Sequence, residues 1–260
     1  MNRFKTFLAE EIETDRILTE NDCFEPVLCE ECGVYGYLLE DEMKKKDADE
    51  ITHGLSYASK MPSATYNLPA SGCKTGAKLA QVPGSVCHGC YAKKGNFTFP
   101  TVKAGMQKKQ DSISHPKWTD AMTTLVKGQA KASPEGQKYF RWHSSGDIQS
   151  PEHLEKIFQV ARNTPEIHHW LPTHEGAMVA KHLMTSKKPD NLNIRVSANM
   201  INGAHPSWAK EKGLTTSGVH TKDKLPAEHH ECPSHTQGNV CGSCRACWSP
   251  KVQSVSYLKH

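Results

Sequence analysis

The chain has 260 residues, 37% of them hydrophobic, which is enough for a globular core in one large domain or two ordinary ones. No apolar run approaches the roughly 18 residues of a membrane span, and the acidic N-terminal stretch is unlike a secretory or transit signal, so we expect a cytoplasmic chain without a membrane partner. Residues 1–50 carry 6 Lys and Arg against 15 Asp and Glu, whereas residues 51–260 carry 26 against 13. The basic body can attract nucleic acid, although scattered, solvated lysines give the same count.

The ten cysteines fall into three groups along the chain. Because the cytosol keeps ordinary thiols reduced, this grouping favours metal or redox chemistry over disulfides. The groups are Cys23, Cys29 and Cys32; Cys73, Cys87 and Cys90; and Cys232, Cys241, Cys244 and Cys247.

Residues 1–50 are predicted to form a separate acidic appendage that ends in the charged linker EDEMKKKDADE. Its cysteines have the spacing C-x5-C-x2-C, which we interpret as a small metal knuckle. Zinc or iron would be completed there by another residue such as His53, and free cysteines in a flexible arm are the alternative. Residues 51–225 would form an α/β core, and residues 226–260 a C-terminal segment with four cysteines.

In the body, residues 61–72 (MPSATYNLPASG) are predicted to be extended and rich in turns. A helical pattern follows over 102–132, with a break expected near His115-Pro116 because proline removes a backbone donor and restricts the residue before it.

The following segments alternate between strand and helix. The helix at 150–162 has the clearest signals, since Ser150 can cap it and Pro151 suits its first turn. The predicted strands are 138–144, 167–173 and 192–198, and the predicted helices between them are 150–162 and 175–186.

This alternation predicts βαβ units and a parallel sheet, in a doubly wound fold or a complete or partial barrel. In each of these architectures, functional residues gather at the carboxyl ends of the strands. The segments SSGD, PTHE and SANM, which follow the three predicted strands, are therefore candidate site segments.

The C-terminal cysteines have the spacing C-x8-C-x2-C-x2-C, so four thiolates can saturate one metal centre. The run C-x2-C-x2-C is similar to the ligand pattern of ferredoxins and favours a 4Fe-4S cluster. Zinc, which more often takes two separated C-x2-C pairs, and metal-free cysteines are the alternatives.

The central group has the spacing C-x13-C-x2-C and no fourth cysteine nearby. A cubane held by Cys73, Cys87 and Cys90 would expose one iron to an external ligand, as reductive cleavage of S-adenosylmethionine (SAM) requires. The alternative is a zinc ion completed by His88 or His53.

Most of residues 51–260 resembles the phage gene product 88 domain family, an uncharacterised set of phage-encoded proteins. The resemblance is carried by the segments GCKTGAKLAQVPGSVCHGCYAKKG, FRWHSSGDIQSPEHLEKIFQVARNTP, WLPTHE, IRVSANM and CGSCRACWSPKVQSVSYLKH. The resemblance implies that the protein acts in the cytoplasm of an infected bacterial host.

The order PGSVCHGCYA, SGD and WLPT is also similar to phage members of the radical-SAM superfamily. That resemblance implies a partial (β/α) barrel, a radical-generating cluster on Cys73, Cys87 and Cys90, and a host electron donor such as flavodoxin or ferredoxin. The usual C-x3-C-x2-C loop and the paired-glycine-and-glutamate segment are absent from this chain, unless Ser145, Gly146 and Asp147 replace the latter.

The same resemblance implies roles for individual residues. Tyr91 would pack beside the cluster, and Ser145, Gly146 and Asp147 would receive the SAM amino group. Arg195 and Ser197 would receive its carboxylate, since a guanidinium offers a two-pronged match to that anion. Asp147, His143 and His174 would be the catalytic candidates on the side of an unknown substrate. A capping role for Asp147 and a rim ion pair for Arg195 are the structural alternatives.

Three functions remain open from the sequence. The first is a radical-SAM-like enzyme with one or two 4Fe-4S clusters. The second is a non-catalytic, metal-stapled module that binds nucleic acid or a host protein, since a structural metal can supply stability comparable to that of a whole domain. The third is a SAM-independent iron–sulfur redox protein or zinc enzyme.

Overall fold

The computed structural model describes residues 26–28, 35–37, 43–129 and 131–259. The predicted knuckle of Cys23, Cys29 and Cys32 lies outside these residues. The chain divides into two compact units, Met1–Glu42 and Met43–His260. In the first, β1 (Pro26–Leu28) and β2 (Tyr35–Tyr37) form an antiparallel pair.

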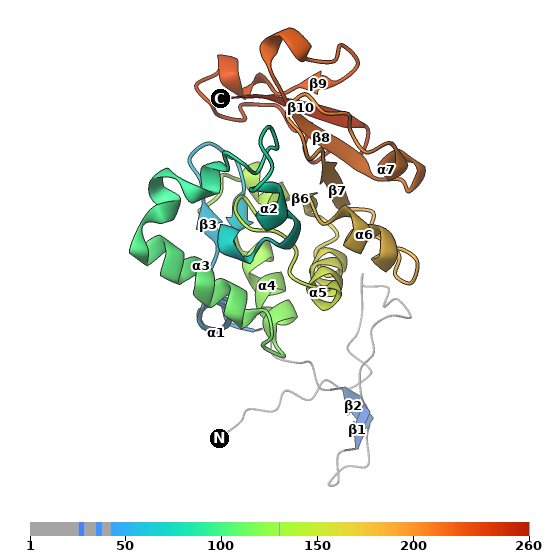
Figure 1. Cartoon of the computed structure of the whole chain (residues 1–260). Helices are drawn as coiled ribbons and strands as arrows, with labels where there is room; N and C mark the ends of the chain where they lie inside the picture. Colours follow the sequence, from blue (N-terminus) through green and yellow to red (C-terminus); the bar gives the residue numbers. More distant parts are fainter. Residues whose placement is uncertain (1–25, 29–34, 38–42, 130, 260) are drawn as a thin grey trace. The chain divides into compact units, whose positions relative to one another are not determined.

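The second unit is built on one eight-stranded sheet with the order β3-β4-β5-β6-β7-β8-β10-β9 (Figure 1). Only β3 and β4 pair in antiparallel fashion, and every other pair in this sheet is parallel. In the described part of the chain the edge strands β3 and β9 are not paired with each other, so the sheet is open. The predicted α/β class with a parallel sheet is confirmed in this form. The strands are β3 Ser56–Tyr57, β4 Ala64–Tyr66, β5 Tyr139–Trp142, β6 His168–Thr173, β7 Leu192–Ser197, β8 Thr215–His220, β9 His230–Glu231 and β10 Ser254–Leu258.

The helices include those predicted from periodicity and capping. The helical pattern over 102–132 is divided into α3 and α4 around His115-Pro116, as expected. The helices are α1 Lys45–Thr52, α2 Lys74–Leu79, α3 Pro100–Ser112, α4 Trp118–Lys127, α5 Pro151–Arg162, α6 Gly176–His182 and α7 Ser207–Glu211.

Helix α5 shows why local signals in the sequence were sufficient to predict a helix. The Ser150 hydroxyl accepts a hydrogen bond from the His153 backbone N–H at 3.1 Å, which satisfies one donor of the first turn. Leu154, Ile157 and Phe158 are fully buried, so the apolar stripe of α5 faces the core.

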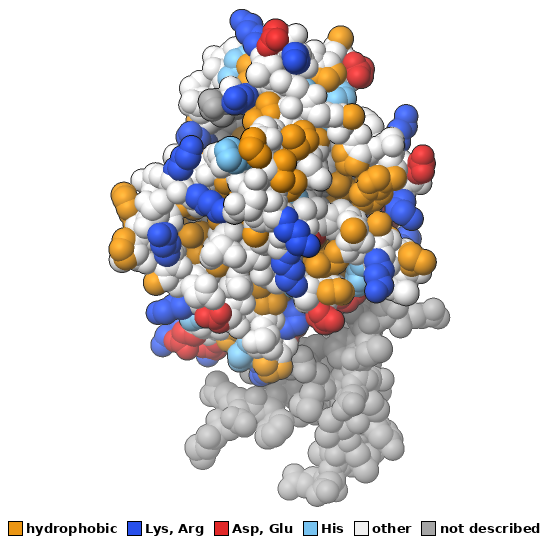
Figure 2. Space-filling model, viewed as in Figure 1, with side chains coloured by type: hydrophobic (Ala, Val, Ile, Leu, Met, Phe, Trp, Pro, Cys, Tyr) orange, Lys and Arg blue, Asp and Glu red, His pale blue; other side chains and the backbone are white. Residues whose placement is uncertain are grey.

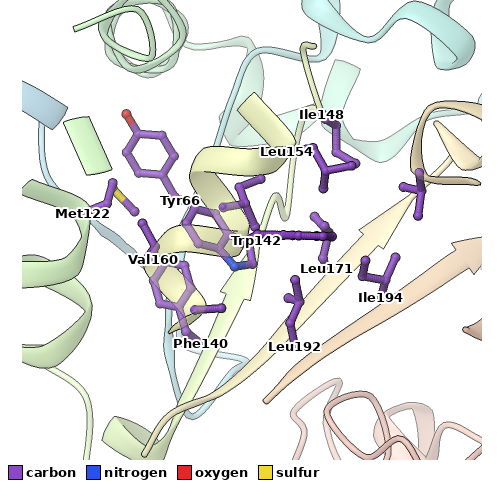
Figure 3. Close-up of a cluster of buried hydrophobic side chains, with 14 of the residues drawn as sticks. Tyr66, Met122, Phe140, Trp142, Ile148, Leu154, Val160, Leu171, Leu192 and Ile194 are labelled. Atoms are coloured by element: carbon purple, nitrogen blue, oxygen red, sulfur yellow. The ribbon is translucent and has the colours of Figure 1, made fainter. Parts of the chain in front are cut away.

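The main core lies between one face of the sheet and the helices α4 and α5. Figure 3 shows Phe140 and Trp142 of β5 among side chains from neighbouring strands and from these helices. The Phe140 and Trp142 rings meet edge to face, with centroids 4.9 Å apart, and Trp118 of α4 lies 6.3 Å from Trp142. Trp142 is therefore a core residue.

The C-terminal chain covers the other face of the sheet, to which the alternate residues of each strand point. The Trp248 indole donates to the Phe140 carbonyl at 2.9 Å and meets Trp170 edge to face at 5.1 Å. Arg195 is fully buried and donates to the backbone carbonyls of this segment. One face of the sheet is thus covered by helices and the other by the C-terminal chain.

The boundaries of the predicted domains differ from those observed. The expected linker over 40–50 contains most of α1, whose Ala48 packs against Ala121 and Leu125 of α4. The charges of this segment lie on an exposed helix face, where Lys45 pairs with Asp49, and this explains why the segment resembled a linker. Residues 226–260, predicted as a separate segment, supply β9 and β10 to the main sheet.

None of the helices in the described part of the chain has the length and apolar character that crossing a bilayer requires.

Candidate metal centre

The connection between β4 and β5 carries Cys73, Cys87 and Cys90, and it is attached to the ends of three parallel strands. The Tyr91 hydroxyl donates to the carbonyl of Ser144, just after β5. The backbone N–H of Val86 donates to the carbonyl of Asn199, just after β7, at 3.0 Å. The cysteine loop therefore lies across the carboxyl ends of the strands, where open parallel sheets bind ligands.

The third attachment joins the loop to the end of β6. Glu175 follows that strand, and its two carboxylate oxygens accept from the Thr75 backbone N–H at 2.7 Å and from the Thr75 hydroxyl at 2.8 Å. Thr75 lies in the first turn of α2, and Cys73 is the N-cap residue of that helix. Glu175 therefore fixes the position of the backbone that carries the first cysteine.

The sulfurs of the loop border one small space. A Cβ atom added to Gly76 would lie 3.6 Å from the Cys87 sulfur and 3.7 Å from the Cys73 sulfur. The three sulfurs of Cys73, Cys87 and Cys90 are not all within 4.8 Å of one another. The group is thus gathered, but its members are spaced more widely than the ligands of a single ion.

The environment of these thiols is acidic and shielded from water. Burial, followed by the charge of Asp147, raises the pKa of Cys73 to about 12. Burial, followed by the charge of Cys90, raises the pKa of Cys87 to about 11. Without a bound cation both groups are neutral thiols at pH 7, because a nearby metal charge is what favours the thiolate.

Asp147 joins the end of β5 to the end of β6. Its carboxylate accepts from the Thr173 hydroxyl at 2.6 Å and from the backbone N–H groups of His174 and Ile148, both at 2.8 Å. Burial is the first cause that raises its pKa, and these hydrogen bonds oppose that effect. The carboxylate thus accepts hydrogen bonds from backbone and hydroxyl groups, as the alternative capping role expects. A catalytic or SAM-binding role for Asp147 stays a prediction.

The neighbours of Asp147 are closely packed. Gly146 has φ +82°, and a Cβ atom there would lie 2.5 Å from the Leu68 Cβ, so the position requires glycine. The Ser145 carbonyl accepts from the Leu68 N–H at 2.9 Å, while the Ser145 hydroxyl is buried and has no hydrogen-bond partner among the described residues. The hydroxyl is therefore a buried polar atom that no described group satisfies.

The two predicted catalytic histidines have different surroundings. His143 is buried at φ +55°, and neither ring nitrogen has a partner in the described part of the chain. Burial holds its pKa well below the ordinary value, and the ring lies 5.4 Å from that of His153. His174 is half-buried, with Nδ1 3.2 Å from the Asn199 side-chain oxygen. A role in substrate binding stays a prediction for both.

Arg195 and Ser197 were predicted to receive the SAM carboxylate. In the structure the Arg195 guanidinium donates to the carbonyls of Thr216 at 2.8 Å and of Ala246 and Val252 at 2.9 Å. These contacts hold the C-terminal chain against the sheet, and they also replace the predicted rim ion pair. Ser197 ends β7 with its hydroxyl 3.3 Å from that of Ser217. Carboxylate binding by either residue stays a prediction.

The C-terminal cysteines form a second gathered group. The thiol of Cys247 lies 3.2 Å from the Tyr257 hydroxyl, and that of Cys244 lies 3.4 Å from Nε2 of His230. Burial raises the pKa of Cys247 to about 12, and burial followed by the charge of Cys232 raises the pKa of Cys241. No three ligand atoms of this group are all within 4.8 Å of one another. His230 was not among the residues singled out from the sequence.

A third group was not predicted at all. His205, His220 and His229 have ring nitrogens that all lie within 4.8 Å of one another, the one such group of three or more His, Cys, Asp or Glu in the described residues. They come from three separate segments, and their spacing matches no zinc motif. No local signal in the sequence pointed to them.

The basic side chains on the face that Figure 2 shows are dispersed. Lys and Arg are scattered there among hydrophobic and uncharged side chains. A nucleic-acid partner stays a prediction.

No curated protein and no solved structure matches the chain. A family model described as Gene product 88 matches residues 38–250, which include the cysteine loop and the four C-terminal cysteines. The chain belongs to the Gene product 88 family of phage proteins.

Proposed function

We propose that this protein is an iron–sulfur enzyme of the radical-SAM type, in which Cys73, Cys87 and Cys90 hold a 4Fe-4S cluster with one iron open to SAM. The observation that carries the proposal is the place of the loop. Three thiols converge at the carboxyl ends of parallel strands, and the loop that bears them is attached to the ends of β5, β6 and β7.

The loop brings two of its sulfurs to one place, because Cys73 and Cys87 border the same space at Gly76. A cubane, whose ligands bind separate irons at its corners, can be held by three cysteines with its fourth iron open to another ligand.

The order of the elements also supports the proposal. The cysteine loop follows β4, the first strand of the parallel set, and Ser145, Gly146 and Asp147 follow β5, the second. This is the order implied by the resemblance to radical-SAM proteins, and a partial-barrel curvature of the sheet belongs to the same proposal.

The residues of this chain then have distinct roles. Tyr91, anchored on Ser144, covers one side of the cluster, and Glu175 holds the loop backbone through Thr75. The unpaired Ser145 hydroxyl is offered to the SAM amino acid group, while Asp147 orients the turn that presents it. When SAM is bound, it supplies radical chemistry for hydrogen abstraction from an unreactive carbon.

We assign a second cluster to Cys232, Cys241, Cys244 and Cys247, as an electron relay or a substrate anchor. The charge of Cys232 raises the pKa of both Cys241 and Cys247, after burial, so these three thiols lie near one another. A flavodoxin or ferredoxin of the host would supply the electrons.

The test is anaerobic purification and reconstitution, followed by iron and sulfide analysis and by reaction with dithionite and SAM. We expect absorption near 400 nm, roughly eight irons per chain for two cubanes, and release of 5'-deoxyadenosine. Cys87→Ser should abolish deoxyadenosine formation and remove half of the iron. His88→Ala, which changes the next residue of the same turn, should retain both.

Two results would contradict the proposal in different ways. A colourless protein that holds zinc would favour the metal-stapled binding module. A fully loaded protein that releases no deoxyadenosine would favour a SAM-independent redox protein.

A further inference from the structure

We infer that His205, His220 and His229 form a binding site for a divalent transition metal ion of the zinc type, separate from both cysteine groups. The site is defined by ring nitrogens that all lie within 4.8 Å of one another. Zinc bound by imidazole at about 2.0 Å brings nitrogens to within about 3.4 Å of each other. Each pair of nitrogens would have to approach by at most about 1.4 Å to bind one ion.

The alternation of side chains along β8 places part of the site on one face of the sheet. Thr216, Gly218 and His220 follow one another at every second residue, so their side-chain positions share one face of the sheet. On the neighbouring strand β10, Ser254 and Ser256 are the register partners of Thr216 and Gly218. The same face thus offers one ligand and several hydroxyls at fixed spacing.

These hydroxyls orient the other two rings. Nδ1 of His205 lies 2.9 Å from the Thr216 hydroxyl, and Nδ1 of His229 lies 3.0 Å from the Ser256 hydroxyl. Each contact leaves Nε2 directed away from the hydroxyl, and Nε2 of His205 is buried without a hydrogen-bond partner among the described residues. Histidines that bind metals through one nitrogen use the other in this way.

A glycine makes room for two of the three rings. A Cβ atom at residue 218 would lie 2.3 Å from Nε2 of His205 and 2.9 Å from Cε1 of His220. Any other residue at this position would push the rings apart. The cradle therefore depends on Gly218.

The ligand set indicates the class of metal. Three imidazoles suit zinc, copper or nickel better than calcium or magnesium, which prefer oxygen. Three protein ligands leave one position open, as in catalytic zinc sites. The Glu228 carboxylate lies 3.9 Å from Nε2 of His229, so the site has one acidic neighbour.

The test uses the full chain and Co²⁺ as the metal probe, with zinc content measured in parallel. We expect Gly218→Ala and His229→Gln each to lose one equivalent of metal relative to the wild type. The difference spectrum should show weak d–d bands without thiolate-to-cobalt charge transfer. His115→Ala, which changes an exposed histidine outside the trio, should bind as much metal as the wild type.

A second measurement separates metal loss from misfolding. Circular dichroism of the metal-free variants should match that of the wild type, and zinc should raise the melting temperature of the wild type more than that of His229→Gln. Equal metal content in the wild type and in a folded trio variant would overturn the inference. A lost equivalent with thiolate charge transfer would also overturn it, since the metal would then be bound to cysteine. Neither outcome affects the iron and deoxyadenosine measurements at Cys87.

Discussion

Glu175 and Thr75 are joined by two hydrogen bonds, 2.7 and 2.8 Å long, although they lie in different segments of the chain. Their contact couples the start of α6 to the start of α2 and so holds the first cysteine of the loop over the sheet. Because Glu175 is buried, its loss leaves two donors without an acceptor.

We predict that Glu175→Ala lowers the free energy of unfolding by about 2–3 kcal/mol, whereas Thr75→Val, which removes one donor and keeps its size, costs about 1 kcal/mol. Urea unfolding at pH 7 provides the measurement. Trypsin cleavage at Lys74 and Lys78 of α2 should be faster in Glu175→Ala. Equal rates in the variant and the wild type would show that Glu175 does not hold the loop.

Gly146 and Gly213 allow the cost of backbone strain to be separated from the cost of steric overlap. Both have positive φ, +82° for Gly146 and +68° for Gly213. A Cβ atom added at Gly146 would overlap Leu68, whereas a Cβ atom added at Gly213 would meet no neighbouring atom within 4 Å. We expect Gly213→Ala to cost about 1–2 kcal/mol from the left-handed conformation alone. Gly146→Ala should cost about 3 kcal/mol or more, because overlap is added to the strain. Denaturant unfolding compares them, and equal losses would contradict the close packing at Leu68.

Arg195 is predicted to be a structural anchor whose loss frees the C-terminal chain. Arg195→Met leaves buried carbonyls without donors and should cost on the order of 3 kcal/mol or more. Arg162→Met is the control, since that side chain is 36% exposed and pairs with Glu155 at the surface, a pair worth up to about 1 kcal/mol. Limited proteolysis of residues 240–253 should accelerate in Arg195→Met alone. Persistence of the proposed SAM-dependent reaction in this variant would exclude Arg195 from SAM binding.

His169 should make stability depend on pH. The Trp142 indole donates to its Nδ1 at 3.2 Å, so Nε2 carries the proton toward the Thr164 hydroxyl at 2.8 Å. Burial lowers the pKa of His169 from 6.5 to about 3, so the unfolded chain takes up a proton at a higher pH than the folded one. Stability is therefore full above pH 6.5 and falls as the pH is lowered toward 3.

We expect His169 to account for about 2 kcal/mol of the stability lost between pH 7 and pH 5. Urea unfolding of the wild type and of His169→Gln at both pH values measures this share. His153, also buried with a pKa of about 3, contributes a similar loss in both proteins, so the difference between them isolates His169. An identical pH dependence in the two proteins would contradict the assignment.

The sequence predicted the elements whose signals are local. Ser150 and Pro151 mark the start of α5, and the predicted strands 138–144, 167–173 and 192–198 correspond to β5, β6 and β7. The three-residue strand β4 was described only as an extended segment. Its assignment depends on pairing with β5, far along the chain, and no local pattern specifies such a partner.

The candidate sites divide in the same way. The cysteine groups were recognised because their members are close in the chain and of one type. The histidine trio depends on the register of β8 and β10 and on the space left by Gly218, which are properties of the folded sheet. The anchoring of Arg195 on the carbonyls of the C-terminal chain is equally a tertiary property, and a guanidinium in a strand carries no local sign of it.

The attachment of Val86 to Asn199 also has a consequence for biosynthesis. The cysteine loop is made early in translation, but the backbone carbonyl that holds its far side is made only after β7. During synthesis the three thiols are therefore exposed before the loop that bears them can be fixed to the sheet. If the proposed cluster forms on this loop, its insertion should follow synthesis of β7, and chains truncated before β7 should bind less iron than the full chain.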